Sequence, residues 1–226
     1  MNLTREHVLE LMSLATGDEK HDWSSLSTVD PLLVLYGRVL RFDPKNPGWE
    51  NRDRFILSKG HGPSAYYAVL ASCGFFPEAW LQTFMRPGSR LGGHPDRHLV
   101  PGVEASTGSL GHGLALAIGM ALGLRAKGLT DPRVTCLTGD AELNEGSNWE
   151  AILLAPHLRL SNVTLLVIDN HTSSINMRPW KAKFESFGWQ AEVIDGHDHD
   201  ALYRSLSAKA AGKPNVVVAD VRRAEE

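Results

Sequence analysis

Two polar residues that follow apolar segments have the chemistry to hold a metal ion. Asp140 follows the apolar segment 134–137, and Asn170 follows the apolar segment 163–168. A carboxylate oxygen of Asp140, an amide oxygen of Asn170 and a backbone carbonyl near Thr172 would be three hard oxygen ligands. Such ligands suit Mg²⁺ or Ca²⁺ and leave coordination positions for phosphate oxygens. An ordinary helix cap and a turn former would give the same pattern, and the pattern alone favours neither interpretation.

The elements around these residues are expected to bring them together. Segments 134–137 and 163–168 are typical of buried strands, and the sequence between them is typical of a helix, so the two strands should be parallel. The carboxyl ends of parallel strands share one sheet edge, where open α/β sheets bind ligands. The backbone N–H groups of Ala141 and Glu142 are expected to open the helix and to favour an anion. The sequence therefore predicts a site for a diphosphate and a divalent metal ion.

The order of these residues resembles a known motif. Gly139-Asp140-Ala141, followed after a gap by Asn170, is similar to the diphosphate- and metal-binding motif of thiamine diphosphate enzymes, and the surrounding sequence resembles the transketolase family. The family has glycine in place of Ala141. The resemblance implies one domain over residues 1–226, an α/β fold with a mostly parallel sheet and helices on both faces, of the type that binds thiamine diphosphate (PP domain). It implies cofactor contacts from Gly139, Ala141, Glu142 and Asn170, and Mg²⁺ or Ca²⁺ on Asp140, Asn170 and Thr172.

The resemblance continues in order through segments 44–62, 92–96 and 104–113. It implies that His61 contacts the diphosphate and that His94 lies near the substrate. It further implies a second substrate histidine, His21, three residues against the cofactor, Gly108, Ser109 and Leu110, and two glutamates at a subunit interface, Glu145 and Glu150. Without the resemblance, His61 would be interpreted as a turn residue and the glutamates as partners of a helix dipole.

The resemblance covers only the diphosphate-binding part of a transketolase. In the family, the glutamate that binds the aminopyrimidine and the arginines that bind sugar phosphates lie in later domains. The chain is therefore expected to be one subunit of a split enzyme, with a partner that carries the pyrimidine-binding and C-terminal domains in an α₂β₂ assembly. The implied reaction transfers a two-carbon ketol unit from a ketose phosphate donor.

Other functions remain open at this point. The chain could belong to a thiamine diphosphate enzyme that acts on 2-oxoacids, such as a dehydrogenase α subunit or a synthase of specialised metabolism. It could instead be an interaction protein that keeps the fold without turnover. An unrelated phosphate-binding α/β module is the third alternative.

Composition limits the possible partners. The 226 residues carry a net charge of −3 without a run of Lys or Arg, so nucleic acid and anionic membranes are not expected as partners. Cys73 and Cys136 lie in apolar sequence and are expected to be buried thiols. Because the sequence shows neither a signal peptide nor a membrane-spanning run, a cytoplasmic protein is expected.

The remaining elements follow from hydrophobic periodicity. Helices are predicted at 4–14, 27–40, 64–73, 114–126, 181–187 and 200–211, and strands at 54–58, 190–194 and 216–221. His197 and His199 are predicted to be solvent-facing residues near the start of the helix at 200.

Overall fold

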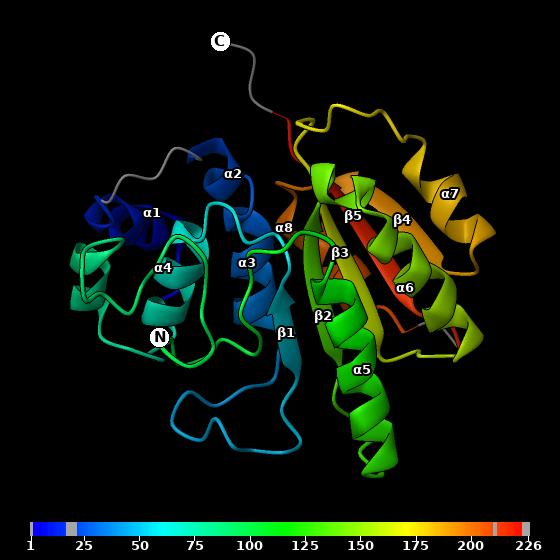
Figure 1. Ribbon diagram of the computed structural model, residues 1–226, viewed down its shortest axis with the longest axis horizontal. Coiled ribbons are helices and arrows are strands. Elements are labelled where there is room, and N and C mark those ends of the chain that lie inside the picture. Colours follow the sequence, from blue (N-terminus) through cyan, green and yellow to red (C-terminus); the bar gives the residue numbers. More distant parts are fainter. Residues whose placement is uncertain (1, 17–21, 210–211, 223–226) are drawn as a thin grey trace.

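A parallel sheet forms the centre of the computed structural model, which describes residues 2–16, 22–209 and 212–222 (Figure 1). Within these residues the sheet has five strands in the order β1-β2-β3-β5-β4. They are β1 (Arg54–Leu57), β2 (Val134–Gly139), β3 (Val163–Asp169), β4 (Gln190–Asp195) and β5 (Asn215–Asp220). Every neighbouring pair is parallel, so the carboxyl ends lie at one edge. The predicted α/β fold is confirmed.

Helices cover both faces of the sheet, as predicted, and strand residues alternate between two apolar cores. Because successive side chains of a strand point to opposite faces, Leu166 and Ile168 of β3 pack into the first core and Leu165 and Val167 into the second. The helices of the first core are α1 (Arg5–Leu14), α3 (Val29–Val34), α4 (Ser64–Ser72) and α8 (His199–Ser207). Those of the second are α5 (Gly113–Ala126), α6 (Gly146–His157) and α7 (Trp180–Ser186).

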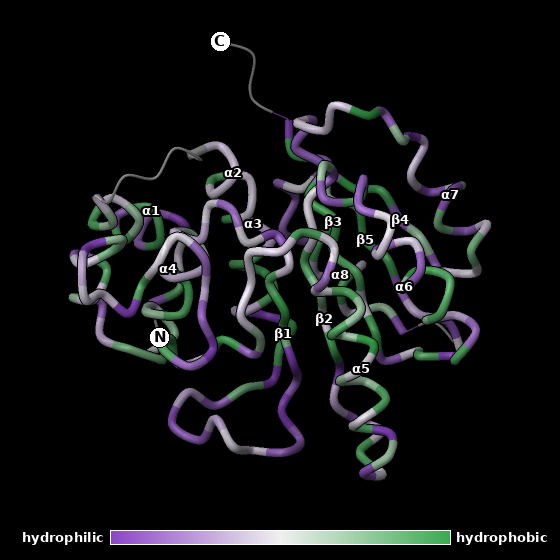
Figure 2. Tube along the Cα trace, viewed as in Figure 1, coloured by the Kyte–Doolittle hydropathy of each residue, from purple (hydrophilic) through white to green (hydrophobic). Residues whose placement is uncertain are grey.

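The distribution of hydrophobic residues explains why this sheet is covered on both sides. Figure 2 shows hydrophobic residues along the central strands and hydrophilic residues in the loop that leads into β1. All residues of β2 and β3 are buried. Strands buried on both faces are typical of parallel sheets, whose crossover helices shield them from water. No described helix combines the length and the apolar character that crossing a bilayer requires.

Most predicted elements begin and end within two residues of their predicted bounds, but two helices differ. The helix predicted at 27–40 begins at Val29 as α3 and ends in a π-helical turn (Leu35–Val39), and a break separates it from the short helix α2 (Asp22–Leu26). The break follows from Ser27 and Thr28, whose hydroxyls donate to the carbonyls of Ser24 and Ser25 at 3.0 and 2.7 Å and so compete with helical hydrogen bonds. The helix predicted at 200–211 ends at Ser207, because Ala208 is extended.

Asp30 joins the first helices to the start of α8. His197 Nδ1 and His199 Nε2 lie 2.8 and 2.9 Å from its carboxylate oxygens, and Arg5 Nε donates to it at 3.2 Å. Asp30 is buried, whereas the side chains of its three partners are about half exposed. His197 and His199 therefore face water near the start of the helix, as predicted, and their contact with the buried Asp30 is an addition that was not predicted. Each ring holds a buried carboxylate on one side and faces water on the other.

We expect Asp30→Asn to lower the free energy of unfolding at pH 7 by about 1–2 kcal/mol, because three half-exposed donors lose a charged acceptor. Burial raises the pKa of Asp30, but the hydrogen bonds from His199 and His197 and the charge of Arg5 have a larger, opposite effect. The pKa of Asp30 therefore lies below its ordinary value of 3.8. A carboxyl with a lowered pKa stabilises the fold above its ordinary pKa, and this contribution is lost as pH falls through the lower folded value.

Urea unfolding followed by circular dichroism measures this difference. The gap between wild type and Asp30→Asn should be present at pH 5 and should shrink below about pH 4. Glu185→Gln, on the exposed surface of α7, is the matched control and should change stability little. A gap that is independent of pH would contradict the assignment.

Candidate functional site

A pocket of about 330 Å³ lies at the carboxyl edge of the sheet, where β2 and β3 end. Eight of the residues predicted for the site line it: His61, Leu110, Gly139, Asp140, Ala141, Glu142, Asn170 and Thr172. Trp23, Ser24 and Lys59 complete the lining. The pairing of Gly139 with Ile168 places the residues that follow β2 and β3 side by side, as the sequence predicts for a parallel pair.

Three oxygen-bearing side chains converge in this pocket. The Thr172 hydroxyl lies 2.7 Å from Asn170 Oδ1 and 3.3 Å from Asp140 Oδ1. The backbone N–H groups of Thr172 and Ser173 donate to Asp140 Oδ2 at 3.1 and 3.2 Å. Asp140 and Asn170 are 1% and 5% exposed. A carboxylate, an amide oxygen and a hydroxyl are hard donors of the kind that Mg²⁺ and Ca²⁺ accept, so these residues fit a divalent metal ion.

Ser27 sets the orientation of the Asn170 amide. Asn170 Nδ2 donates to the Ser27 hydroxyl at 3.3 Å, which turns Oδ1 toward Thr172 and Asp140. Ser27 in turn donates to the carbonyl of Ser24. Sequence reasoning assigned no role to Ser27, because nothing in the local pattern links it to a residue 143 positions away.

The segment after Asp140 differs from the predicted helix start. Ala141 to Asn144 form a short 3₁₀ turn, η3 (Ala141–Asn144), and the α-helix begins only at Gly146. The Ala141 N–H donates to Asp140 Oδ1 at 2.9 Å. The prediction that the N–H groups of Ala141 and Glu142 open an α-helix is therefore wrong. Because Ala141 has helical backbone angles, this position does not require the glycine of the related motif.

His61 and His94 face one another beside the pocket. Their ring centroids lie 5.1 Å apart at an interplanar angle of 77°. His61 lines the pocket, whereas His94 is exposed and borders Gly108, where an added Cβ would lie 3.7 Å from its ring. Ser109 lines an adjacent cavity of about 240 Å³. His21 lies outside the described residues.

Lys59 is a buried cation that sequence reasoning missed. It is 7% exposed, lines the pocket, and donates through Nζ to the backbone carbonyl and hydroxyl of Ser24. A buried ammonium group at the wall of a pocket attracts an anion more strongly than a solvated one. Its place two residues after β1 and before the Gly60-His61 turn was the available sequence signal.

Glu145 and Glu150 do not line the pocket. Both side chains are exposed at the start of α6, and Glu145 is the N-cap residue without a side-chain capping bond. Residues on the outer face of the neighbouring helix α5, among them Leu116 and Gly119, are exposed as well. A role of the two glutamates at a subunit interface therefore stays a prediction.

A network of ion pairs and hydrogen bonds fixes the segment that follows Asn170. Arg178 binds the buried Asp169 through Nε at 3.0 Å and approaches His171 Nδ1 at 3.0 Å. His171 Nε2 lies 2.8 Å from Asp220 Oδ1, and Trp180 Nε1 donates to Asp169 at 2.7 Å. These contacts tie the segment 171–180 to the ends of β3 and β5 and thereby restrict where Thr172 can lie.

The turn 108–113 packs closely against its neighbours. Gly111 has φ +82°, and an added Cβ would lie 2.5 Å from Ser147 Oγ and 2.7 Å from Glu145 Cβ. At Gly113, an added Cβ would lie 2.3 Å from Ser58 Cβ. Both glycines are needed because no side chain fits in these positions.

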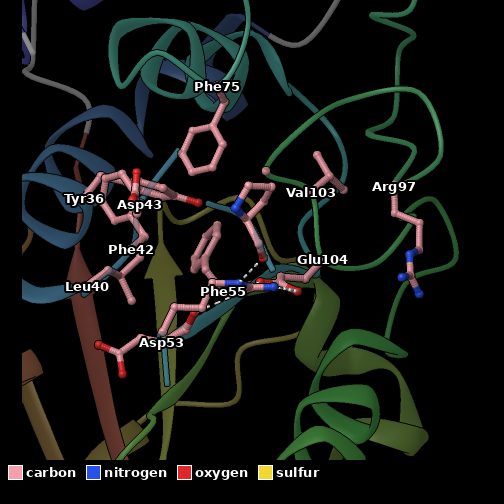
Figure 3. Close-up of a pocket in the computed structure, with 13 residues that line it drawn as sticks. Tyr36, Leu40, Phe42, Asp43, Asp53, Phe55, Phe75, Arg97, Val103 and Glu104 are labelled. Atoms are coloured by element: carbon pink, nitrogen blue, oxygen red, sulfur yellow. Dashed lines mark hydrogen bonds and ion pairs between the residues drawn. The ribbon is translucent and has the colours of Figure 1, made fainter. Parts of the chain in front are cut away.

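A second pocket, of about 160 Å³, lies at the other end of β1 and contains no predicted site residue (Figure 3). Aromatic rings surround it: Phe42 and Phe75 stack at 5.4 Å, and Tyr36 meets Phe55 edge-on at 5.6 Å. Two of its charged residues, Arg52 and Glu104, are paired with each other.

The chain matches one family model, described as "Transketolase, thiamine diphosphate binding domain", over residues 5–221. Ferredoxin fas2 of Rhodococcoides fascians is 46% identical over 217 residues, 94% of this chain and 70% of that protein. An apulose-4-phosphate transketolase subunit of Actinobacillus succinogenes is 41% identical over 214 residues, 90% of this chain and 76% of that protein. A 6-deoxy-6-sulfo-D-fructose transketolase subunit of a Clostridium species is 39% identical over 227 residues, 96% of this chain and 81% of that protein.

Solved structures give the same fold. The transketolase of Campylobacter jejuni superposes with a TM-score of 0.81 at 30% identity, over 97% of this chain and 38% of that chain. The chain thus spans little more than a third of the length of that transketolase. The match extends the resemblance from the motifs to the arrangement of the whole sheet.

Two glycines of α5 provide a matched test of the close packing. Gly113→Ala should lower the free energy of unfolding by about 1–3 kcal/mol, because Ser58 and the turn must move to admit the methyl group. Gly119→Ala meets nothing within 4 Å and should raise stability by up to about 1 kcal/mol through helix propensity. Urea unfolding of the two variants measures both effects. Equal effects of the two substitutions would contradict the packing described here.

Proposed function

The chain belongs to the transketolase family as a thiamine diphosphate binding domain, and on this premise we propose that it is the diphosphate-binding subunit of a two-subunit transketolase. The main support is the convergence of Asp140, Asn170 and Thr172 at the sheet edge, beside the buried Lys59. We further propose that the chain forms a single domain and transfers a two-carbon ketol unit only when it is joined to a partner subunit.

The names and lengths of the relatives support a split enzyme. Two relatives at 41% and 39% identity are named as transketolase subunits, and this chain covers 76% and 81% of their lengths. By contrast, the chain covers 38% of the transketolase of Campylobacter jejuni. In our proposal, a second chain supplies the pyrimidine-binding and C-terminal domains, and the assembly is α₂β₂.

In this proposal the residues of the pocket divide the binding of the cofactor among them. Asp140, Asn170 and Thr172 hold Mg²⁺ or Ca²⁺, with the Thr172 backbone carbonyl as a further candidate ligand. Lys59 and His61 bind the anionic diphosphate. When bound, thiamine diphosphate supplies the carbon chemistry of ketol transfer, and the protein supplies binding and orientation.

The remaining residues of the pocket wall and those beside the pocket are proposed to act on the cofactor ring and on the substrate. Leu110 contacts the cofactor from the turn that also contains Gly108 and Ser109, and Gly139, Ala141 and Glu142 form the wall beside it. His94, together with His21, offers hydrogen-bond donors or proton acceptors to substrate oxygens. Glu145 and Glu150 lie at the interface between subunits in this proposal.

Other functions find less support. An iron–sulfur protein, as the name of the relative from Rhodococcoides fascians suggests for that protein, generally needs four cysteine ligands. This chain has two cysteines, Cys73 and Cys136, and both are buried. Use of 2-oxoacid donors is the main alternative, because the pocket described here binds the cofactor and does not select the donor.

Asp140→Asn should weaken the binding of thiamine diphosphate with Mg²⁺ at least tenfold, because it keeps the size of the side chain but removes the negative charge and one acceptor oxygen. Asn170→Ala should have a similar effect. Isothermal titration calorimetry, with and without the partner subunit, measures both. Asp195→Asn is the matched control, because Asp195 ends the outermost strand β4 at the same sheet edge and does not line the pocket. Wild-type affinity in Asp140→Asn would refute the proposed metal site.

Turnover should require both subunits. We expect no ketol transfer from the purified chain with thiamine diphosphate and Mg²⁺, and transfer after the candidate partner is added. A donor screen of ketose phosphates and 2-oxoacids, followed by product analysis, separates the two candidate reactions. Turnover by the chain alone would refute the split arrangement, and activity confined to 2-oxoacids would replace transketolase chemistry with the alternative.

A further inference from the structure

Glu142 is a buried carboxylate that three separate segments contact. The residue is 2% exposed. Its Oε1 atom accepts hydrogen bonds from the Ser58 hydroxyl, just after β1, and from the Gly111 N–H at 2.9 Å. Its Oε2 atom accepts a longer bond, 3.4 Å, from the Gly139 N–H at the end of β2. One side chain therefore connects two strand ends to the turn 108–113.

Each of these segments contributes a neighbouring residue to the pocket. Lys59 follows Ser58, Leu110 precedes Gly111, and Asp140 follows Gly139. Glu142 also borders the pocket, but both of its oxygens are engaged by the protein. Its carboxylate therefore sets the distances between three walls of the pocket and does not need to contact the ligand itself.

The contacts around Glu142 leave the turn little freedom. The Gly113 N–H donates to the Ser58 hydroxyl at 3.0 Å, so Ser58 links the start of α5 to the carboxylate. On the other side, the Ser147 hydroxyl donates to the Gly111 carbonyl at 2.9 Å. Small changes at Glu142 should therefore be transmitted to the turn.

Burial of this carboxylate carries a cost that simple packing does not explain. Burial raises the pKa of Glu142, and the hydrogen bonds from Ser58, Gly111 and Gly139 counteract only part of that shift. An apolar side chain of similar size would avoid the desolvation. It would also leave the N–H groups of Gly111 and Gly139 without an acceptor in the buried interior.

We propose that Glu142 is a positioning residue for the pocket. It holds the turn that carries Leu110 and the strand end that carries Asp140 in the relative placement that ligand binding requires. The identity of the ligand, thiamine diphosphate with its metal ion, rests on the proposed function, whereas the placement of the two segments does not. Ligand affinity should accordingly depend on a side chain whose oxygens do not contact the ligand.

Two variants of Glu142 and a matched control test the proposal. Glu142→Ala should weaken the binding of thiamine diphosphate in saturating Mg²⁺ at least tenfold, whereas Glu142→Gln should remain within about threefold of wild type, because its Oε1 still accepts from Ser58 and Gly111. Glu10→Ala, at an exposed side chain of α1, should bind like wild type. Calorimetry of the full chain with its partner subunit measures affinity, at a temperature where thermal unfolding shows every variant to be folded.

Hydrogen exchange provides a readout that is independent of the cofactor. Amides 111 and 113 should exchange at least tenfold faster in Glu142→Ala than in wild type, while amides of β3 should not change. Unchanged exchange at 111, or wild-type cofactor affinity in Glu142→Ala, would overturn the positioning role. If wild type itself fails to bind thiamine diphosphate, the proposed function fails, and the exchange measurement alone decides the role of Glu142.

Discussion

The structure depends on the pairing of two parallel strands that end in oxygen-bearing residues. The register of β2 against β3 places Asp140 beside Asn170 at the sheet edge, and the Thr172 hydroxyl joins their oxygens. A shift of that register would separate the two residues and move alternate strand side chains to the wrong core. The apolar packing of both faces therefore specifies the register, and the register in turn brings together the oxygens of the candidate metal site.

Buried polar groups around the pocket form hydrogen bonds with other groups of the protein, and these bonds fix the positions of the pocket walls. Ser27 accepts a hydrogen bond from the Asn170 amide and so orients it, and Ser24 accepts one from Lys59. Glu142 accepts hydrogen bonds from two strand ends and from the turn 108–113. Each of these groups would be costly to bury alone, so each is paired. Hydrogen bonds between protein groups thus fix the walls of the pocket, and fixed walls lower the ordering cost of binding a ligand.

The central strand–helix–strand unit was predictable because its signals are local. Apolar runs of strand length, each followed by Asp140 or Asn170, indicate both the parallel pair and its shared edge. The contacts of Ser27 with Asn170, and of His197 and His199 with Asp30, join residues more than 140 positions apart, so no local pattern reveals them. The direction of the Glu142 side chain was missed for another reason. It depends on a 3₁₀ turn where an α-helix was expected, and this changes which way residue 142 points.

The pocket draws its walls from both sides of the sheet. Ser24 and Trp23 belong to the helical segment on the first core, whereas Leu110 and Glu142 belong to the segments around α5 and α6 on the second. A ligand bound between them contacts both layers, so the two layers cannot separate unless the ligand dissociates. A ligand that binds only the native state stabilises it increasingly as the free ligand concentration rises above the dissociation constant, so occupancy couples the two layers into one cooperative unit. Resistance of the chain to proteolysis, and hence its lifetime, would then follow the supply of the vitamin-derived cofactor.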